Sequence, residues 1–273
     1  MRSLTRGLQG LVRRKTAVAA AATLFLIALI IVFAGLISRY DPLEQNIALR
    51  LSPPSSSHIF GTDGFGRDVL SRVLHGGKVT LYVALFSVTV AVLIGIPLGA
   101  YAAYSGGWQD LVIGRIIDAF LGFPFIVLAV IIVVALESSP TSVAVAIAAV
   151  LAPRITVLTR TSALLVVQEP YIQASKVAGA GNGRVVFRHV LPNCIAPPLS
   201  QAVGYIGTAV ATESTLSYLG LGVPPPYPSW GRMIQEGTTL FFESAPWLVI
   251  FPGVALLLLV VCFSLLSGIL WKQ

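Results

Sequence analysis

The sequence predicts an all-α membrane protein that crosses the bilayer with six transmembrane helices. Hydrophobic residues make up 56% of the 273 residues and charged residues only 11%, whereas about a quarter of the residues of a typical soluble domain are charged. The apolar residues also fall into six long runs, near the ~20 residues that a helix needs to cross a membrane. A soluble core is a poorer explanation, because these runs are long and spread over the whole chain.

A basic segment precedes the first apolar run. Residues 1–16 carry five Lys and Arg side chains, and residues 17–38 are predicted to form the first transmembrane helix. The run exceeds the roughly 7–15 apolar residues of a signal peptide, and no small-x-small cleavage site follows it. We therefore expect an uncleaved helix with a cytoplasmic N-terminus at residues 1–16.

Residues 39–78 form a polar insert that is predicted to be an extracytoplasmic loop. Its first half is rich in proline and serine, which is typical of irregular structure. In its second half, Val69 and Val73 would share one side of a helix, with Arg72 largely on the other. This pattern predicts an amphipathic helix at the membrane interface, ended by the glycine pair 76–77.

Five further apolar runs form the predicted core, residues 79–270. They cover residues 79–104, 111–136, 141–159, 195–219 and 247–270. With the N-terminus inside, twelve Lys and Arg residues fall on the cytoplasmic side and six on the other. Because basic residues concentrate in cytoplasmic loops, this balance favours both termini in the cytoplasm.

Residues 168–192 form a segment that membrane insertion does not explain, and the predicted topology places it in the cytoplasm. It carries three glycines and five charged or histidine side chains. Small side chains dominate residues 171–181, which predicts a short helix able to fit closely into a groove of a second protein. The alternative is a surface loop that happens to be polar.

Three polar residues stand out in the fifth predicted span: Thr208, Thr212 and Glu213. An ionisable group within a membrane costs at least roughly 2.5–3.5 kcal/mol, so such a group is expected to face protein or water. We therefore expect these residues to line a path through the membrane. The alternative is that Glu213 makes a structural hydrogen bond or ion pair within the helix bundle.

The connection at residues 220–245 is rich in proline and aromatic residues. The prolines stiffen this loop, and Trp230 within it and Trp247 just after it suit the interface between membrane and water. Two interpretations remain: a rigid outer cap that receives a partner protein, or simply a rigid connection.

Several classes of function lack their motifs. The sequence contains no H-E-x-x-H, no G-x-S-x-G and no phosphate-binding loop, so no catalytic residues are expected. Its two cysteines lie far apart and its three histidines are scattered, so no metal site is expected. The glycines at 179–183 follow a helical pattern and not a strand, which argues against a dinucleotide site. The net charge of +7 fits cytoplasmic loops better than nucleic-acid binding.

The segment 168–192 resembles the permease signature of ABC importers, E-A-A-x-x-x-G followed by I-x-L-P. The matching positions are Gln173, Ala174, Ser175, Gly179, Leu191 and Pro192. Residues 61–77, 212–231 and 245–253 are similar to stretches of the dipeptide/oligopeptide/nickel subfamily, specifically its second permease. The chain departs from the signature where Gln173 replaces the glutamate, Ser175 replaces the second alanine and His189 replaces the isoleucine.

The resemblance implies a type I ABC importer permease fold in the bacterial plasma (inner) membrane. It implies three kinds of partner: a homologous permease that shares the pathway, two cytoplasmic ATPases, and an extracytoplasmic solute-binding protein. ATP and magnesium would be bound by the ATPases, with no cofactor on this chain. The ATPase-coupling residues would be Tyr171, Gln173, Ala174, Ser175, Gly179, Ala180, Gly181, Leu191 and Pro192.

Short peptides are the expected cargo, with nickel, glutathione or another small solute as the alternative. Two other classes of protein remain as rivals. An ion-coupled secondary transporter would need an internal repeat and an ion site at the midplane, and we find no repeat in the sequence. A scaffold subunit would not need polar groups within its spans.

Overall fold

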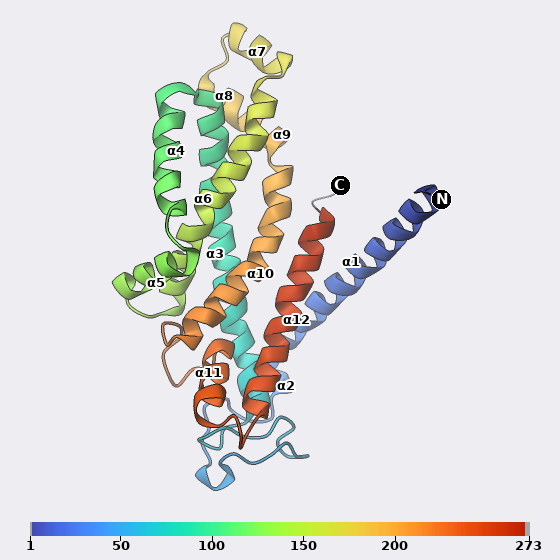
Figure 1. The fold of residues 1–273 in the computed structure, drawn as a ribbon, viewed down its shortest axis with the longest axis vertical. Coiled ribbons are helices and arrows are strands. Elements are labelled where there is room, and N and C mark those ends of the chain that lie inside the picture. The colour runs from blue at the N-terminus through green and yellow to red at the C-terminus, as the bar shows by residue number, and fades with distance from the viewer. Residues whose placement is uncertain (1, 271–273) are drawn as a thin grey trace.

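The computed structural model describes residues 2–270, and for residues 2–14, 17, 176, 269 and 270 it describes the backbone alone. The chain folds into an elongated bundle of helices (Figure 1). The helices are α1 (Arg2–Val32), α2 (Ala34–Ile37), the 3₁₀ turn η1 (Ile47–Leu49), α3 (Val69–Ser105), α4 (Gly107–Leu121), α5 (Phe125–Leu136), α6 (Pro140–Val167), α7 (Pro170–Val177), α8 (Asn182–Val185), the π-helical turn η2 (Val186–Val190), α9 (Leu191–Cys194), α10 (Ala196–Tyr218), α11 (Trp230–Leu240) and α12 (Trp247–Leu270).

Helices α3 and α6 form the centre of the bundle, and glycines of α3 set how closely they approach. A Cβ atom added to Gly95 would lie 2.8 Å from the carbonyl oxygen of Ala152, and one added to Gly99 would lie 2.7 Å from Cβ of Thr159. Both distances are too short for a real side chain. Small residues therefore allow the two backbones to pack directly, as is common between membrane helices.

The structure differs from the prediction of a short interfacial helix at the end of the polar insert, because α3 begins there. The side chain of Asp68 caps the helix by accepting a hydrogen bond from the Ser71 amide at 2.8 Å. The helix then continues through Gly76 and Gly77 as far as Ser105. The prediction of a separate interfacial helix that ends at the glycine pair was therefore wrong.

The packing of Trp230 explains why these glycines do not end the helix. The indole Nε1 donates a hydrogen bond to the carbonyl oxygen of Val73 at 2.8 Å. A Cβ atom added to Gly77 would lie 2.9 Å from Cζ2 of Trp230 and 2.7 Å from Cδ1 of Ile31. A glycine within a helix costs about 1 kcal/mol relative to alanine, and burial of a tryptophan side chain offsets more than that.

The predicted span 111–136 is broken in the structure. Helices α4 and α5 meet at an angle of 92°, with Pro124 at the start of α5. Because proline lacks an amide proton and restricts the residue before it, the α4 helix does not continue through this point.

Helix length and composition identify some of the predicted spans. Within the described residues, α3, α6 and α12 are long and apolar enough to cross a membrane, and the bent pair α4–α5 adds a fourth crossing if it acts as one span. In α1, the apolar stretch within the residues whose side chains the structure describes is Val18–Val32. The predicted count of six is therefore not confirmed.

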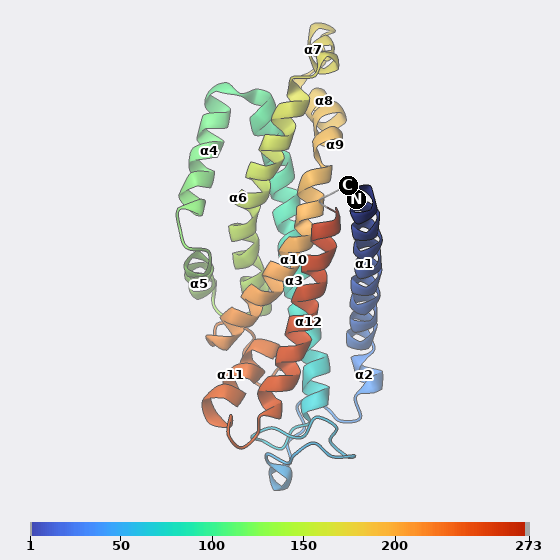
Figure 2. The ribbon, with the colours of Figure 1, turned by 45° about the vertical axis from the view of Figure 1, so that its right-hand side comes forward.

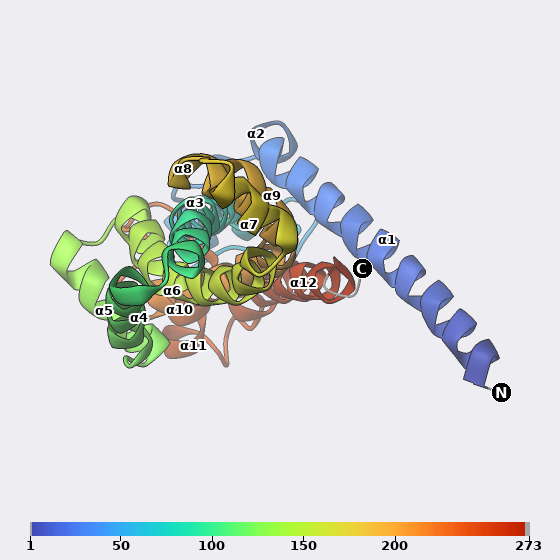
Figure 3. The same ribbon diagram turned by 90° about the horizontal axis from the view of Figure 1, so that it is seen from above.

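The two ends of the bundle are built from different segments. Helices α7 and α8 lie at one end, whereas the irregular insert and α11 lie at the other (Figures 1 and 2). Helix α1 approaches α12 and then diverges from the bundle toward its N-terminus (Figure 3). The segments predicted to be cytoplasmic thus gather toward one end.

Candidate functional site

The signature segment projects from the body of the protein. Helix α7 lies beyond the ends of α3 and α6 (Figures 1 and 2). The side chains of Tyr171, Gln173 and Ala174 are exposed, while Ser175 and Ala180 are half-buried. The predicted helix at 171–181 is present but ends at Val177. The turn of chain that follows it completes the projecting segment.

A small hydrophobic cluster anchors this segment to the bundle. Ile172 is fully buried and belongs to the same cluster as Val185, Val186 and Val190 of the following turns. The cluster also contains Ala100, Ala103 and Tyr104 of α3 and Ala163 of α6. Apolar burial therefore couples the position of α7 to the ends of two central helices.

Two hydrogen bonds extend this attachment. The hydroxyl of Tyr104 donates to Oδ1 of Asn182 at 3.0 Å. The side-chain amide of Gln173 donates to the carbonyl oxygen of Val167, the last residue of α6, at 3.1 Å. A glutamate, the residue usual at this signature position, has no such donor when ionised.

Gly179 has a conformational role in the turn that follows α7. Its φ angle is +79°, in the left-handed region. The Ala180 amide donates to the carbonyl oxygen of Ser175 at 3.1 Å, which is the six-residue closure of a Schellman motif. Among the atoms that the structure describes, a Cβ atom at Gly179 would meet nothing within 4 Å. Within the chain, backbone conformation and not space is what favours glycine at this position.

The polar residues of α10 differ in accessibility. The side chain of Thr208 is exposed, whereas Thr212 and Glu213 are buried, the latter with 1% exposure. Thr212 donates its hydroxyl proton to the carbonyl oxygen of Thr208 at 2.8 Å. The three predicted path residues therefore share one helix but not one environment.

Glu213 lies at the centre of a buried hydrogen-bond cluster. Its carboxyl group accepts from Thr80 of α3 at 2.9 Å, from Ser217 at 2.7 Å and from Ser214 at 3.3 Å. The bond from Thr80 joins α3 to α10. The hydrogen-bonded arrangement that the sequence left open is thus present in this conformation.

An ion pair that the sequence did not predict holds α4 against α6. The guanidinium of Arg160 donates from Nε to Oδ1 of Asp110 at 2.5 Å and from Nη2 to Oδ2 at 2.6 Å. The two residues lie far apart in the sequence, and no local pattern connects them. A bidentate geometry of this kind fixes orientation as well as distance.

Two models of known protein families match most of the chain. Residues 95–272 match the family model of the binding-protein-dependent transport system inner membrane component. Residues 5–54 match the N-terminal transmembrane domain of oligopeptide transport permease C.

Curated relatives cover nearly the whole chain. The dipeptide transport system permease protein DppC of Alkalihalophilus pseudofirmus is 41% identical over 239 residues, which is 88% of this chain and 78% of the relative. The di/tripeptide permease DppC of Pseudomonas aeruginosa is 37% identical and covers 95% of this chain and 87% of its own length. The glutathione permease GsiD of Pectobacterium atrosepticum is also 37% identical, with 93% and 85% covered.

Solved structures share the fold at low sequence identity. The MetNI methionine ABC transporter in inward-facing conformations matches with a TM-score of 0.60 at 19% identity, over 74% of this chain and 95% of the other. An amino acid ABC transporter with histidines matches with a TM-score of 0.56 at 16% identity, over 74% and 93%. These matches confirm the predicted all-α, type I permease fold.

An apolar helical bundle with a projecting signature helix defines an integral membrane permease of the ABC importer class. The chain belongs to the family of binding-protein-dependent transport system inner membrane components, within the dipeptide and oligopeptide group. It is therefore a multi-pass protein of the inner membrane. Members of the family are permease components and are not themselves catalytic, and ABC importers in general combine them with a second permease, ATPases and a binding protein.

Proposed function

We propose that this chain is the pathway-forming permease subunit of an ATP-driven importer for short peptides. The observation that carries this proposal is its 41% identity over 88% of the chain to a permease named for dipeptide transport. Other relatives at 37% identity are named for dipeptide or di/tripeptide transport. Glutathione, itself a short peptide, is the second candidate cargo, because a glutathione permease is also 37% identical.

The importer would contain this chain, one homologous permease, two ABC ATPases and an extracytoplasmic binding protein. ATP and magnesium would bind to the ATPases. The end of the bundle that carries α7 would face the cytoplasm, together with both termini, and residues 39–78 would lie outside. The excess of basic residues in the segments assigned to the inside supports this orientation.

The coupling segment would meet an ATPase through α7 and the Gly179 turn. Exposed small side chains at Ala174 and around Gly179 allow a partner groove to approach the backbone closely. The anchoring of Ile172 in the bundle supports this role, because a force on α7 would be passed to α3 and α6. Leu191 and Pro192, which close the signature, begin α9 and lead into α10.

The pathway would run along α10. Thr208 supports this placement, because its side chain is the exposed one between residues 200 and 217 of α10, where the other side chains are buried or half-buried. Thr212 and Glu213 are buried behind it. They would contribute to the pathway by shaping this face, or directly when α10 separates from α3 during the transport cycle.

Reconstituted transport tests the proposal. The complete importer in proteoliposomes, with binding protein outside and ATP inside, is expected to accumulate a labelled dipeptide only when ATP and all subunits are present. Omission of the second permease is the control for assembly. Uptake driven by an ion gradient without ATP would contradict the proposal, and uptake of glutathione but not of dipeptides would select the second cargo.

A further inference from the structure

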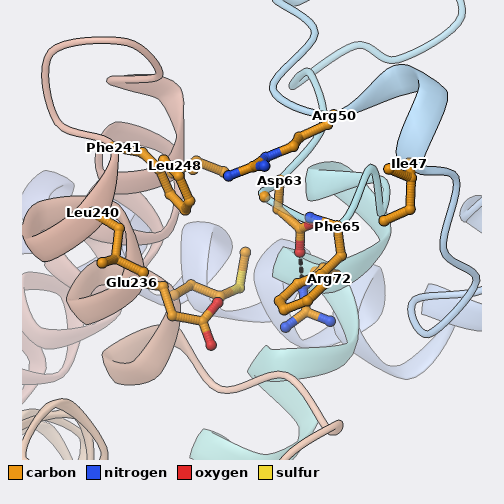
Figure 4. Close-up of a pocket in the computed structure, with 11 residues that line it drawn as sticks. Ile47, Arg50, Asp63, Phe65, Arg72, Glu236, Leu240, Phe241 and Leu248 are labelled. Carbon is orange, nitrogen blue, oxygen red and sulfur yellow. Dashed lines mark hydrogen bonds and ion pairs between the residues drawn. The ribbon is translucent and has the colours of Figure 1, made fainter.

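The end of the bundle opposite α7 contains a cavity that no part of the proposed mechanism uses. Its volume is about 510 Å³, and it lies between the insert, α11 and the start of α12. The side chains of Arg50, Asp63, Arg72 and Glu236 give it charge (Figure 4). Phe65, Phe241 and Leu248 supply part of its apolar wall. The cavity is therefore a charged site with apolar sides.

Arginines that are buried or half-buried outnumber their carboxylate partners beside this cavity. Asp63 is shared by two arginines, with Oδ2 2.6 Å from Nε of Arg67 and 3.4 Å from Nε of Arg72. Glu236 is also shared, with oxygens 3.9 Å from Nη2 of Arg67 and 3.7 Å from Nε of Arg232. Three arginines thus face two carboxylates.

Arg50 adds a further positive charge at the cavity. Its side chain extends from the insert toward Phe241 and Leu248 (Figure 4), and its Cζ lies 5.7 Å from the centroid of the Phe241 ring. It is exposed and forms no ion pair with any side chain that the structure describes. The lining residues alone carry two arginines and two carboxylates. Arg67 and Arg232 share these carboxylates without lining the cavity, and they bring the excess of the whole cluster to two positive charges.

An excess of positive charge between apolar walls attracts an anionic group. Low-dielectric walls focus the field of the arginines, and a guanidinium without a partner is free to form a bidentate pair with a carboxylate. Arg72 is only 1% exposed and is held by Asp63 and by the carbonyl oxygen of Pro42 at 3.1 Å. The buried arginines therefore supply a fixed field, and Arg50 supplies the accessible donor.

We propose that this cavity receives an acidic side chain of the extracytoplasmic binding protein when that protein docks on the permease. The inference rests on the proposed function for its orientation, which places this end outside the cytoplasm. The cavity is lined by elements of this one chain, and none of its lining residues belongs to α10, so a docking contact fits it better than the cargo route. Its volume accommodates a side chain and its flanking backbone.

The charge reversal Arg50→Glu tests the proposal in the complete importer. Purified binding protein is titrated onto proteoliposomes, and the half-saturating concentration for stimulation of ATP hydrolysis is measured. Arg50→Glu is expected to raise that concentration about tenfold, because a like charge then faces the incoming carboxylate, while the maximal rate stays unchanged. The difference from the wild type is expected to shrink at high salt, which screens exposed charges.

Arg39→Glu is the matched control, because Arg39 is an exposed arginine of the same insert outside the cavity. An unchanged half-saturation for Arg50→Glu, or an equal shift for both variants, would overturn the proposal. A shift in the apparent affinity for peptide at saturating binding protein would assign the cavity to cargo and overturn it as well. Rescue of Arg50→Glu by an acid-to-lysine variant of the binding protein would identify the partner residue.

The two proposals fail in different ways. If the wild-type importer shows no ATP-dependent peptide uptake, the proposed function fails before the docking test is reached. If the wild type transports normally and Arg50→Glu does so with the same requirement for binding protein, the docking inference alone fails.

Discussion

Tyr104 at the end of α3 donates a hydrogen bond to Asn182 at the start of α8, with 3.0 Å between the hydroxyl and Oδ1. The two residues lie 78 positions apart in the sequence. They join a central helix of the bundle to the segment that follows α7. A displacement of α7 by an ATPase would thus reach α3 through a polar contact as well as through the Ile172 cluster.

Removal of the Tyr104 hydroxyl should weaken this transmission. A hydrogen bond of this kind contributes about 0.5–1.5 kcal/mol, so Tyr104→Phe is expected to reduce the peptide transported per ATP by roughly two- to tenfold. Uptake and hydrolysis measured in the same proteoliposomes provide the ratio. Tyr101→Phe is the control, because Tyr101 is an exposed tyrosine on the same helix. Equal ratios for the two variants would show that the contact is not used in coupling.

The Gly179 turn should tolerate asparagine better than alanine. A non-glycine residue in the left-handed region costs roughly 1–2 kcal/mol of conformational free energy, and asparagine adopts this region more readily than alanine does. Gly179→Ala is therefore expected to weaken stimulation of the ATPases, with Gly179→Asn intermediate between it and the wild type. Gly183→Ala lies within α8 and should leave stimulation unchanged. Full activity of Gly179→Ala would contradict a requirement for this backbone conformation.

The Thr80–Glu213 hydrogen bond should stabilise the packing of α3 against α10. Thr80→Val removes the donor, and Glu213→Ala leaves buried hydroxyls without their acceptor, so each is expected to cost about 1–3 kcal/mol. Because the residues are in contact, the double variant should cost less than the sum of the single ones. Thermal unfolding of the purified complex measures these effects. Thr161→Val, at an exposed hydroxyl of α6, is the control.

Glu213→Gln separates a structural role from a role in the pathway. Glutamine keeps the size of the side chain and one carbonyl acceptor, so the melting temperature is expected to fall by less than for Glu213→Ala. Uptake by this variant then reports on the pathway. Loss of uptake at normal stability supports a direct contribution of the carboxyl group to transport, whereas unchanged uptake assigns Glu213 to structure alone.

A side chain at Gly77 should disrupt the contact with Trp230. A Cβ atom there would lie 2.7 Å from Ile31 and 2.9 Å from Trp230, so Gly77→Ala is expected to destabilise the protein by about 1–3 kcal/mol despite the higher helix propensity of alanine. In α2, Gly35→Ala meets no described atom within 4 Å and should be neutral. Equal melting temperatures for both variants would contradict the packing argument.

The helices that the sequence predicted best are α10 and α12, whose apolar runs are long, and Pro252 lies inside α12 without ending it. The last helix begins at Trp247, as predicted, and α10 covers nearly the predicted residues. The prediction was wrong at Gly76–Gly77, because a glycine pair is a local stop signal that a distant tryptophan overrode. Pro124 marks the break in the predicted span 111–136. The sequence alone does not specify whether a proline bends a helix or ends it.

The candidate site also has some features that the sequence predicts and others that it does not. The short helix near residue 171 and its small side chains follow from the residues themselves, and so do the all-helical class and the membrane environment, since hydrophobicity and its spacing are local properties of the chain. The Tyr104–Asn182 bond, the Asp110–Arg160 pair and the arginine-rich cavity join segments tens of residues apart. Their partners are chosen by how the helices pack, and only the tertiary structure decides that, because a hydrogen bond or an ion pair depends on distance in space.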